Sequence, residues 1–454
     1  MNRNDLMDFI NWLEINTPVT SWQAEGVNVW PIIRINIYFE NFKKNDRTTP
    51  ANNSKIQFKN ASLKNRRFSL FLNNPRHDHT ADCLFVTNSI CNKLVMDKYI
   101  NIYTDPVIEK LKSEGKKSIV LEQEKITNSS PMPNGPRFYI SQDLTEFAKK
   151  HKLDKVKCYV QDMEKVIIIL AKKGFKKTAN YILNNFRNLR FLVNKKYFQD
   201  ILSRVKPKSV YFTCYYGEKM AFVSAAREIG IQTIDLQHGI QGDYHAAYGR
   251  WENVPSSGYS MLPDVFSVWS DKEKDSIITW SSKLQNSPHQ AQVDGNPWLD
   301  MWKQKNPTTR YYDDLFSREF PSANGRKRLL FTHQDSYSWP DWFPTALQRT
   351  TKDFDIFFRV HPGANESLPS WRKYFKDKGI NNIILERATN WPLLALMRHM
   401  DVHVTCYSSC VIEAETLGVP SLVITDDGET YFKDQIQKGT CKRVKSADDF
   451  LINL

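Results

Sequence analysis

The sequence lacks several features that would assign its chemistry at once. Its seven cysteines are scattered and form no C-x-x-C pair, which argues against a disulfide framework and favours a reducing compartment. No apolar run reaches the roughly 18 residues that a membrane-spanning helix needs, and the first residues show no charged region followed by a long apolar run, so no signal peptide is expected. No Gly-x-Gly-x-x-Gly or Walker loop occurs, which argues against a nicotinamide enzyme or a kinase. We therefore expect a cytoplasmic protein, with at most peripheral contact with the inner face of the plasma membrane.

The chain has a surplus of positive charge. Its 63 Lys and Arg residues against 50 Asp and Glu residues give a net charge of +13, which suits phosphate-rich partners such as nucleotides, lipid-linked pyrophosphates or an anionic membrane surface. The basic segments, such as Lys172–Lys173 and Lys176–Lys177, alternate with apolar helical positions and form no long tail. Nucleic acid is therefore not the partner that we expect.

The pattern of apolar runs predicts the fold. At 454 residues the chain exceeds what one core usually serves. Short apolar runs alternate with amphipathic stretches, as in parallel sheets with crossover helices. We predict an α/β protein with two Rossmann-like doubly wound domains facing across a cleft. The N-terminal domain is placed at 1–305, with an N-terminal extension whose first 75 residues have no readable role, and the C-terminal domain at 306–454. Predicted strands are 81–87, 118–122, 209–216, 231–237, 264–270, 328–334, 355–362, 382–387, 401–408 and 420–425, with a linker at about 295–326.

Ser408 and Ser409 lie between a predicted strand and the helix CVIEAETLG. Ligands of open parallel sheets bind outside the carboxyl ends of the strands. The free N–H groups at the start of this helix, its dipole and the two hydroxyls would form a cradle for a phosphate. A serine here is also an ordinary N-cap, so both interpretations stay open. Glu413, one turn later, is predicted to accept hydrogen bonds from a ribose or to complement the helix dipole.

Two further strands of the C-terminal half end in polar residues. Arg359 and His361 lie at the end of the strand in FFRVHPG, where both are expected to donate to phosphate oxygens. Gln334 and Asp335 follow the first strand of this half, in the loop HQDSYSWPDW, and are predicted to contact the donor or the acceptor.

The best strand of the N-terminal half leads into the loop HGIQGDYHAAY. His238 ends this strand and is predicted to act as a general base on an acceptor hydroxyl. Gly239 allows close approach of the backbone to a ligand. Asp243 and His245 are competing bases on the same loop, with structural roles left open as an equal alternative.

These elements together resemble a pattern of bacterial surface-polysaccharide transferases with the GT-B fold. LQHG (236–239) is similar to the Trp-His-Gly element, and YSSCVIEAETLGVP (407–420) to the Tyr-Ser-Ser element, of the CDP-glycerol glycerophosphotransferases that polymerise teichoic acid. The His-Pro and Ser-Ser pair also resembles bacterial sialyltransferases and capsule-export Kdo transferases. The resemblance covers about residues 205–430. It implies the GT-B arrangement, with an acceptor-side N-terminal domain and a C-terminal domain that binds the nucleotide donor. It also implies a catalytic base at His238, a donor-phosphate contact at His361, a nucleotide-phosphate turn at Ser408–Ser409, and no obligatory metal.

The leading hypothesis is a glycosyltransferase. It would move a sugar from a nucleotide-sugar donor to a lipid-linked or oligosaccharide acceptor of a growing capsule, O-antigen or lipopolysaccharide. No cofactor and no metal site are expected. Inversion is favoured, because Ser408 rather than a glutamate stands seven residues before Glu415. The alternatives are a polyol-phosphate transferase of the teichoic-acid type and a nucleotide-sugar 2-epimerase. The epimerase would need an acid at a strand end of the N-terminal half, for which Asp105 and Glu122 are the candidates.

Overall fold

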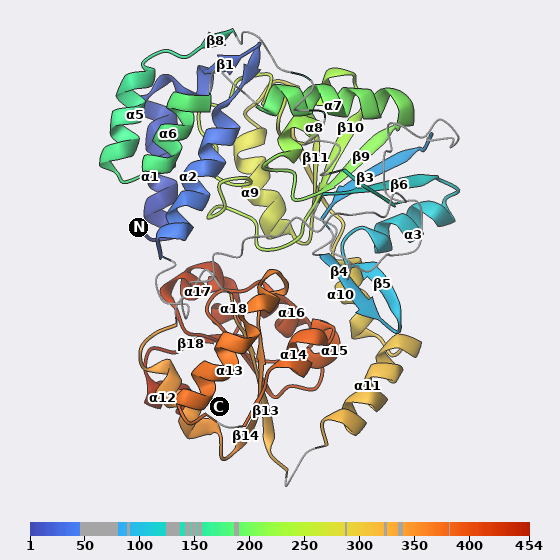
Figure 1. Cartoon of the computed structure of the whole chain (residues 1–454), viewed down its shortest axis with the longest axis vertical. Coiled ribbons are helices and arrows are strands. Elements are labelled where there is room, and N and C mark those ends of the chain that lie inside the picture. Colours follow the sequence, from blue (N-terminus) through green and yellow to red (C-terminus); the bar gives the residue numbers. More distant parts are fainter. Residues whose placement is uncertain are drawn as a thin grey trace. The chain divides into compact units, whose positions relative to one another are not determined.

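The computed structural model divides the chain into two compact units. It describes all residues except 46–79, 89–90, 124–136, 141–146, 148–150, 152–156, 186–189, 287, 322–324, 335–338 and 381. Unit 1 contains Met1–Asn41, the described residues from 80 to Lys93, and Lys98–Asn296. In its described part, unit 2 contains Phe42–Asn45, Leu94–Asp97 and Pro297–Leu454. Each unit is described by itself (Figure 1).

Unit 1 is built on a sheet of seven strands in the order β12-β11-β10-β9-β3-β6-β7, and every neighbouring pair is parallel. The chain moves outward from the centre in two directions, so the order reverses between β3 and β9. Such a switch point is where open α/β sheets bind ligands. The strands are β3 (Cys83–Thr87), β6 (Ser118–Glu122), β7 (Arg137–Tyr139), β9 (Ser209–Thr213), β10 (Gln232–Leu236), β11 (Val265–Val268) and β12 (Gln290–Val293).

Helices cover both faces of this sheet. On one face, α3 (Asp105–Ser113) packs Leu111 against Phe85, Val120 and Leu236. On the other, α7 (Arg190–Val205) and α8 (Lys219–Glu228) lie side by side, and their rings Phe198 and Phe222 have centroids 4.1 Å apart. A further helix, α9 (Asp271–Ser281), follows β11. The alternation of strand and helix is what the sequence pattern predicted for this half.

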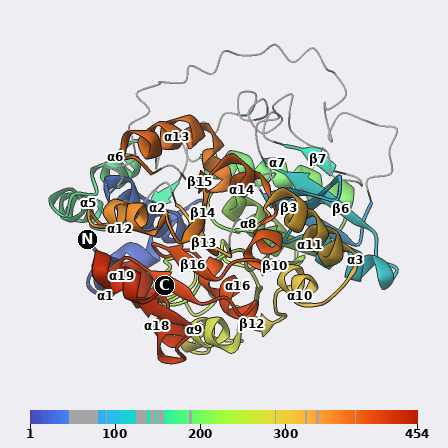
Figure 2. The ribbon, with the colours of Figure 1, turned by 90° about the horizontal axis from the view of Figure 1, so that it is seen from below.

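The first 45 residues form two helices, and of these residues Met1–Asn41 belong to unit 1. Helix α1 (Arg3–Asn16) and helix α2 (Trp30–Asn45) are joined by a 3-10 turn, η1 (Pro18–Ser21), and a short hairpin, β1 (Gln23–Ala24) with β2 (Val27–Asn28). They gather with α5 (Met163–Lys172) and α6 (Lys176–Asn185), as Figures 1 and 2 both show. The rings of Phe9 and Phe175 stack at 5.4 Å, and β1 also pairs with β8 (Cys158–Tyr159).

A buried ion pair ties these two helices to the loop that follows β10. Arg34 of α2 and Glu14 of α1 are in direct contact, and both side chains are fully buried. Arg34 also donates through Nη2 to the carbonyls of Gly249 at 2.8 Å and Arg250 at 3.2 Å. Glu14 accepts a hydrogen bond from the backbone N–H of Glu252 at 2.9 Å. The N-terminal segment, whose role was unreadable from its sequence, therefore braces the far end of the loop that carries His238.

Unit 2 contains a second parallel sheet, with six strands in the order β15-β14-β13-β16-β17-β18. Its switch point lies between β13 and β16. The predicted class of two Rossmann-like doubly wound domains is thus confirmed, with one more strand in this sheet than the five predicted. The strands are β13 (Lys327–Thr332), β14 (Phe354–Arg359), β15 (Ile383–Ile384), β16 (Val402–Thr405), β17 (Ser421–Val423) and β18 (Cys441–Arg443).

Helices pack on this sheet around a buried core that includes Phe331, Phe358 and Trp371. They are α12 (Phe343–Thr350), α13 (Leu368–Asp377) after the 3-10 turn η4 (Pro362–Ser367), α14 (Glu386–Asn390), α15 (Leu393–Met397), α16 (Cys410–Thr416), α17 (Asp426–Tyr431), α18 (Lys433–Gln437) and α19 (Ala447–Ile452).

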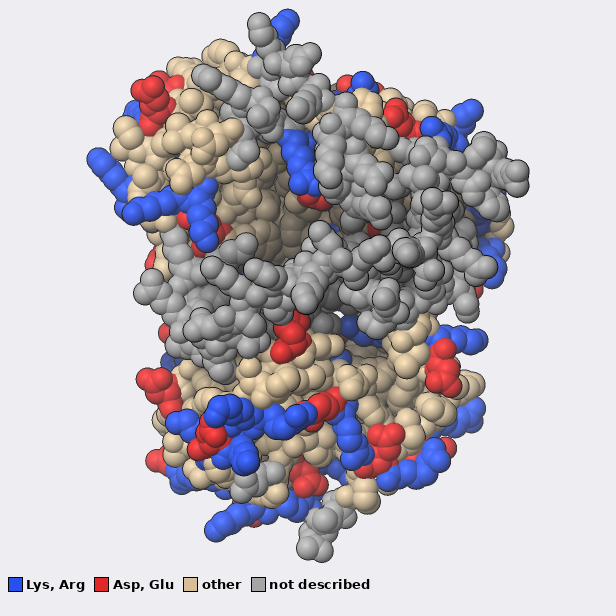
Figure 3. Space-filling view, viewed as in Figure 1, with Lys and Arg blue, Asp and Glu red and all other residues tan. Residues whose placement is uncertain are grey.

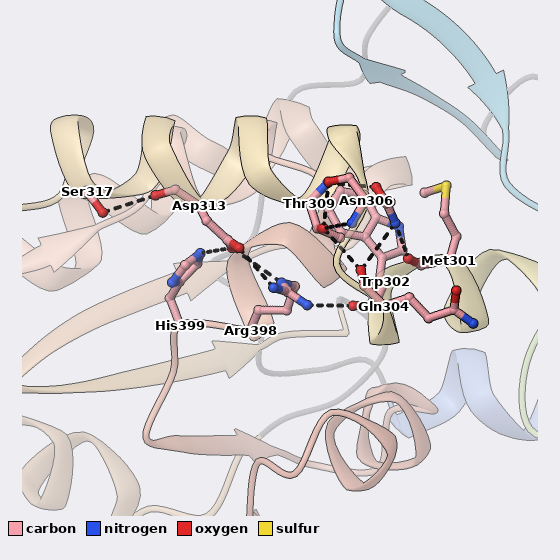
Figure 4. Close-up of polar contacts among 9 residues, drawn as sticks. All are labelled: Met301, Trp302, Gln304, Asn306, Thr309, Asp313, Ser317, Arg398 and His399. Carbon is pink, nitrogen blue, oxygen red and sulfur yellow. Dashed lines mark hydrogen bonds and ion pairs between the residues drawn. The ribbon is translucent and has the colours of Figure 1, made fainter.

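Two helices of unit 2, α10 (Pro297–Lys303) and α11 (Pro307–Glu319), occupy the segment that was predicted as a linker. Asn306 and Thr309 form a capping box at the start of α11. Figure 4 shows Asp313 of α11 pointing toward Arg398 and His399, at 2.9 and 3.0 Å. The segment is therefore an ordered part of unit 2 rather than an open connection.

The charged residues of the face seen in Figure 3 are mixed. Lys and Arg side chains alternate with Asp and Glu side chains, most evidently in the lower part of the picture. Among the described residues, no helix has both the length and the apolar character needed to cross a bilayer.

Candidate functional site

A row of polar residues crosses the switch point of unit 1 at the carboxyl ends of its strands. Thr87 of β3 pairs in register with Glu122 of β6, and Thr213 of β9 pairs with Leu236 of β10. The pair Val86–Phe212 brings Thr87 and Thr213 to the same level. Side chains alternate along a strand, so these residues continue the face that packs on α3 through Phe85, Val120 and Tyr211.

A hydrogen-bond network holds part of this row. Its centre is the pair Asn92 and Asn101, the first and last residues of a hairpin formed by β4 (Asn92–Val95) and β5 (Lys98–Asn101). Asn92 donates through Nδ2 to Oε1 of Glu122 at 3.2 Å. Asn101 donates to Oδ1 of Asn92 at 3.0 Å and to Oγ1 of Thr87 at 3.2 Å. Glu122, which is fully buried, is thereby fixed at the end of β6, whereas Asp105 accepts from the N–H of Asn101 at the start of α3.

His238 follows β10 by two residues and is half-buried beside Tyr216. Its Nε2 lies 3.4 Å from the Tyr216 hydroxyl, and its carbonyl accepts a hydrogen bond from the Tyr103 hydroxyl at 2.8 Å. Burial lowers the pKa of His238 to about 4, and the charge of Lys219 adds to the shift. The imidazole is therefore neutral at physiological pH. Its Nδ1 is buried and has no hydrogen-bond partner among the described residues, and the same holds for Oγ1 of Thr213.

His245 also lies beside Tyr216. Its ring centroid is 5.4 Å from that of Tyr216 and 4.8 Å from that of Tyr38, which comes from α2. Its Nδ1 accepts a hydrogen bond from the N–H of Ala247 at 3.2 Å, which places the ring proton on Nε2. Burial, with the charge of Arg3 as the next cause, holds the pKa of His245 well below its usual value. The structure thus brings the two predicted histidines together around one tyrosine.

Three residues of this region escaped the sequence analysis. Tyr216 follows β9 and contacts both histidines, and burial holds its pKa well above the usual value, so its phenol stays protonated. Lys219 is buried at the start of α8 and donates to the Thr213 carbonyl at 2.9 Å. Asp235 is buried within β10, and burial raises its pKa to about 7. Their position in the sequence could have identified them. Asp235 lies within a predicted central strand, whereas Tyr216 and Lys219 lie between β9 and the first turn of the helix that follows it.

Asp243 does not join the two histidines by hydrogen bonding. Its side chain is exposed and accepts a hydrogen bond from the Ser276 hydroxyl of α9 at 2.8 Å. Gly239 likewise has no packing constraint, since nothing lies within 4 Å of where a Cβ would stand. The tight position of this loop is Gly249, where a Cβ would lie 2.5 Å from the Gly242 carbonyl oxygen.

These two glycines make a matched test of the loop. Gly249→Ala is expected to lower the free energy of unfolding by about 1–3 kcal/mol, because the loop must open to admit the methyl group. Gly239→Ala is expected to leave stability unchanged. The measurement is the midpoint of thermal unfolding for both variants and the wild type. Equal midpoints for the two variants would show that the close approach at Gly249 does not constrain the loop.

In unit 2, Arg359 ends β14 with a buried guanidinium. Its Nη1 donates to the carbonyls of Ala388 at 2.5 Å and Trp391 at 2.6 Å, which ties the end of α14 to the sheet. Burial lowers the pKa of Arg359 to about 10, and the carboxyl of Glu413 partly offsets this. Burial likewise raises the pKa of Glu413, with Arg359 opposing the shift. These two predicted residues therefore lie within electrostatic reach of each other.

Ser408 and Ser409 lie at the carboxyl end of β16, on one side of the switch point. Ser408 is buried, and its Oγ accepts a hydrogen bond from the N–H of Cys410 at 3.4 Å. Ser409 is the N-cap of α16 and makes no capping hydrogen bond with its side chain. Ser409 thus occupies the N-cap position without a capping hydrogen bond, whereas the hydroxyl of Ser408, one residue earlier, accepts a backbone N–H of this helix.

The remaining predicted residues of unit 2 are Gln334, His361 and Asp335. Gln334 follows β13 by two residues, across the switch point from Ser408, and its Oε1 is buried with no hydrogen-bond partner in the described part of the chain. His361 is exposed directly before η4, and its carbonyl accepts from the N–H of Ala364 at 2.9 Å. Asp335 lies outside the described residues. No group of three metal-ligating side chains was found in the ranges that the structure describes.

Comparison with known proteins gives structural similarity alone. No family model and no curated protein matches the sequence. The chain is similar to the UDP-GlcNAc 2-epimerase of Neisseria meningitidis bound to UDP-GlcNAc, with 16% identity over 82% of this chain and 89% of that one and a TM-score of 0.47. The Methanocaldococcus jannaschii UDP-GlcNAc 2-epimerase in complex with UDP-GlcNAc and UDP is 12% identical over 81% of this chain and 90% of that one, with a TM-score of 0.48. A glycosyltransferase of Rickettsia africae is 12% identical over 82% of this chain and 86% of that one, with a TM-score of 0.43.

These structures correct the leading functional hypothesis. Several of the similar structures are named as UDP-GlcNAc 2-epimerases, so these names back the 2-epimerase alternative better than the predicted glycosyltransferase, while the similarity itself shows the fold alone. Burial lowers the pKa of His238 to about 4, whereas a general base works best with a pKa near the working pH. The predicted base role of His238 is untested and stays a prediction. The resemblance to the teichoic-acid and capsule transferases stays a prediction.

Proposed function

We propose that this protein is an enzyme that binds a nucleotide sugar and moves a proton on its sugar, as a nucleotide-sugar 2-epimerase does. The observation that carries the proposal is the placement of Glu122 and His238 at the carboxyl ends of β6 and β10 in one parallel sheet. The two strands are separated by β3 and β9, that is, by three strand spacings of about 4.8 Å, or roughly 14 Å in all. Two side chains and a sugar ring fill such a span.

The two groups suit different parts of a proton transfer. Inverting carbon 2 of the sugar requires removal of its proton from one face and return of a proton to the other. Glu122, fixed by Asn92, is the carboxylate proposed to take the proton. The electron pair left behind forms a double bond between carbons 1 and 2 as the bond from carbon 1 to the nucleotide phosphate breaks, and the reverse bond changes with protonation from the other face give the epimer. His238 is proposed to donate a hydrogen bond to the phosphate oxygen on which negative charge develops when this bond breaks. A carboxylate base paired with a neutral histidine that stabilises a developing negative charge on oxygen is an established division of roles in enzymatic proton transfer.

The nucleotide-binding role is proposed for the switch point of unit 2. Gln334 and Ser409 support it, since Oε1 of Gln334 is buried without a partner among the described residues and the Ser409 side chain makes no capping bond. Buried polar groups of this kind need a partner, which a bound ligand supplies. Ser408, Glu413, Arg359 and His361 complete the proposed set, with Glu413 as the ribose contact. Independence of metals stays a prediction.

The test is an assay without any acceptor. The protein is incubated in D2O with CMP-, CDP-, UDP- and GDP-linked sugars, in the presence of a chelator, and the sugar is analysed by NMR and mass spectrometry. We expect one donor class to raise the midpoint of thermal unfolding, and its sugar to gain deuterium at the inverted carbon together with a new epimer. A flat thermal response to every nucleotide sugar, or binding without deuterium incorporation, would exclude the proposed reaction.

A further inference from the structure

We propose that Phe39 of α2 and Tyr216 form a stacking surface for the sugar ring of the substrate beside His238 and His245. This inference rests on the proposed function and adds a specificity-determining residue from the N-terminal helices. The ring centroids of Phe39 and Tyr216 are 5.7 Å apart. The centroid of Tyr216 is in turn 6.0 Å from that of His238 and 5.4 Å from that of His245.

The exposure of these rings distinguishes them from a core cluster. Phe39 is 37% exposed, and Tyr216, His238 and His245 are each half-buried. A single exposed aromatic residue on a protein surface needs no explanation. Here, however, the exposed ring continues a group of partly open rings that includes both histidines of the site. A continuous surface of this kind suits a ligand that presents apolar C–H groups on one face and hydroxyls at its edge, as a pyranose ring does.

The neighbours of Phe39 hold it in a defined position. Tyr38, the preceding residue, is buried, and its ring lies 4.8 Å from that of His245. Its hydroxyl accepts a hydrogen bond from Nη1 of Arg3 at 2.9 Å, which links α2 to α1. One turn before Phe39, Arg34 anchors the same helix to the carbonyls of Gly249 and Arg250. Helix α2 is thus fixed at two levels to the loop that carries the histidines, and a rigid aromatic side chain on it binds a ring with little loss of conformational entropy.

Two measurements test the stacking surface. In the first, the KM for the nucleotide sugar that the wild type turns over is measured for Phe39→Ala, Phe39→Trp and Trp12→Ala. Trp12 is the matched control, because it is a 45% exposed aromatic residue on α1 of the same helical pair. We expect Phe39→Ala to raise KM about tenfold, Phe39→Trp to restore it, and Trp12→Ala to have no effect. Affinity for the nucleotide without its sugar is expected to be the same in all variants.

The second measurement does not depend on turnover. Saturation-transfer difference NMR with methyl pyranosides reports which sugar protons contact the protein, and we expect signals from one ring face that Phe39→Ala removes and Trp12→Ala keeps. Equal KM values or equal saturation transfer in Phe39→Ala and the wild type would overturn the stacking surface while leaving the proposed function intact. If no nucleotide sugar is turned over but pyranoside contacts still depend on Phe39, the proposed function fails and the ring-binding surface stands.

Discussion

Replacing Arg34 by methionine is expected to lower the free energy of unfolding by about 3–5 kcal/mol, because the change leaves the carboxylate of Glu14 buried without its cation. Both side chains of this pair are fully buried. The guanidinium also donates to two carbonyls of the loop after β10 and lies over the ring of Trp251, with 3.9 Å from its Cζ to the ring centroid. Methionine keeps much of the side-chain volume, so the expected loss is electrostatic and hydrogen-bonding in origin.

The pH dependence of this loss separates it from a packing defect. Burial raises the pKa of Glu14, and the charge of Arg34 opposes that shift. Without Arg34, the folded-state pKa of Glu14 rises further above its unfolded value. A group of this kind destabilises the fold as the pH rises through its folded-state pKa. The difference in stability between the wild type and Arg34→Met should therefore widen from acid toward neutral pH, whereas a difference caused by packing would stay constant.

The measurement is urea unfolding followed by tryptophan fluorescence at several pH values. A matched control is Lys373→Met, which breaks an ion pair on the surface. Nζ of Lys373 lies 2.9 Å from Oδ2 of Asp377, and the two side chains are 77% and 58% exposed. Solvent screens that pair, so little change is expected. If Arg34→Met unfolds at the same urea concentration as the control, the ion pair does not stabilise the N-terminal helices.

The sequence predicted the strands that are buried on both faces, because such strands are continuous apolar runs. SIVLE and DIFFRV are of this kind, and they became β6 and β14. The edge strands β12 and β18 were not predicted. Their residues are QAQV, which is largely exposed, and CKR, in which only Cys441 is buried, so neither run carries an apolar pattern. The helices α10 and α11 were also not predicted, since mixed charge and prolines obscured the capping box at Asn306.

The candidate site was predictable wherever a residue follows a strand. His238, Arg359, Ser408 and Gln334 all lie at strand ends, as the rule for open parallel sheets requires. The contribution of the N-terminal helices was not predictable. Arg34 contacts Gly249, which is 215 residues away in the sequence, and no local pattern encodes such a contact. The burial that lowers the pKa of His238 was equally unpredictable before the fold was known.

Glu122→Gln is expected to lower the turnover of the nucleotide sugar by roughly 10²–10⁴-fold, the range that one acid–base group contributes. Glutamine keeps the size of the side chain and an Oε1 that accepts the hydrogen bond from Nδ2 of Asn92. The link between β6 and the hairpin of β4 and β5 is therefore preserved. What the substitution removes is the ability to take and return a proton. Affinity for the nucleotide and the midpoint of thermal unfolding should accordingly stay at their wild-type values.

Incorporation of deuterium from solvent is the decisive measurement, because it reports proton removal even when no net epimer accumulates. Glu114→Gln is a suitable control, since Glu114 is an exposed glutamate of the same unit that pairs with Lys116 at 2.8 Å. We expect deuterium incorporation to vanish in Glu122→Gln and to persist in Glu114→Gln. Persistence in Glu122→Gln at the wild-type rate would mean that another group takes the proton. In that case Glu122 acts only to hold Asn92, and Asn92→Ala would then lower stability as much as Glu122→Ala does.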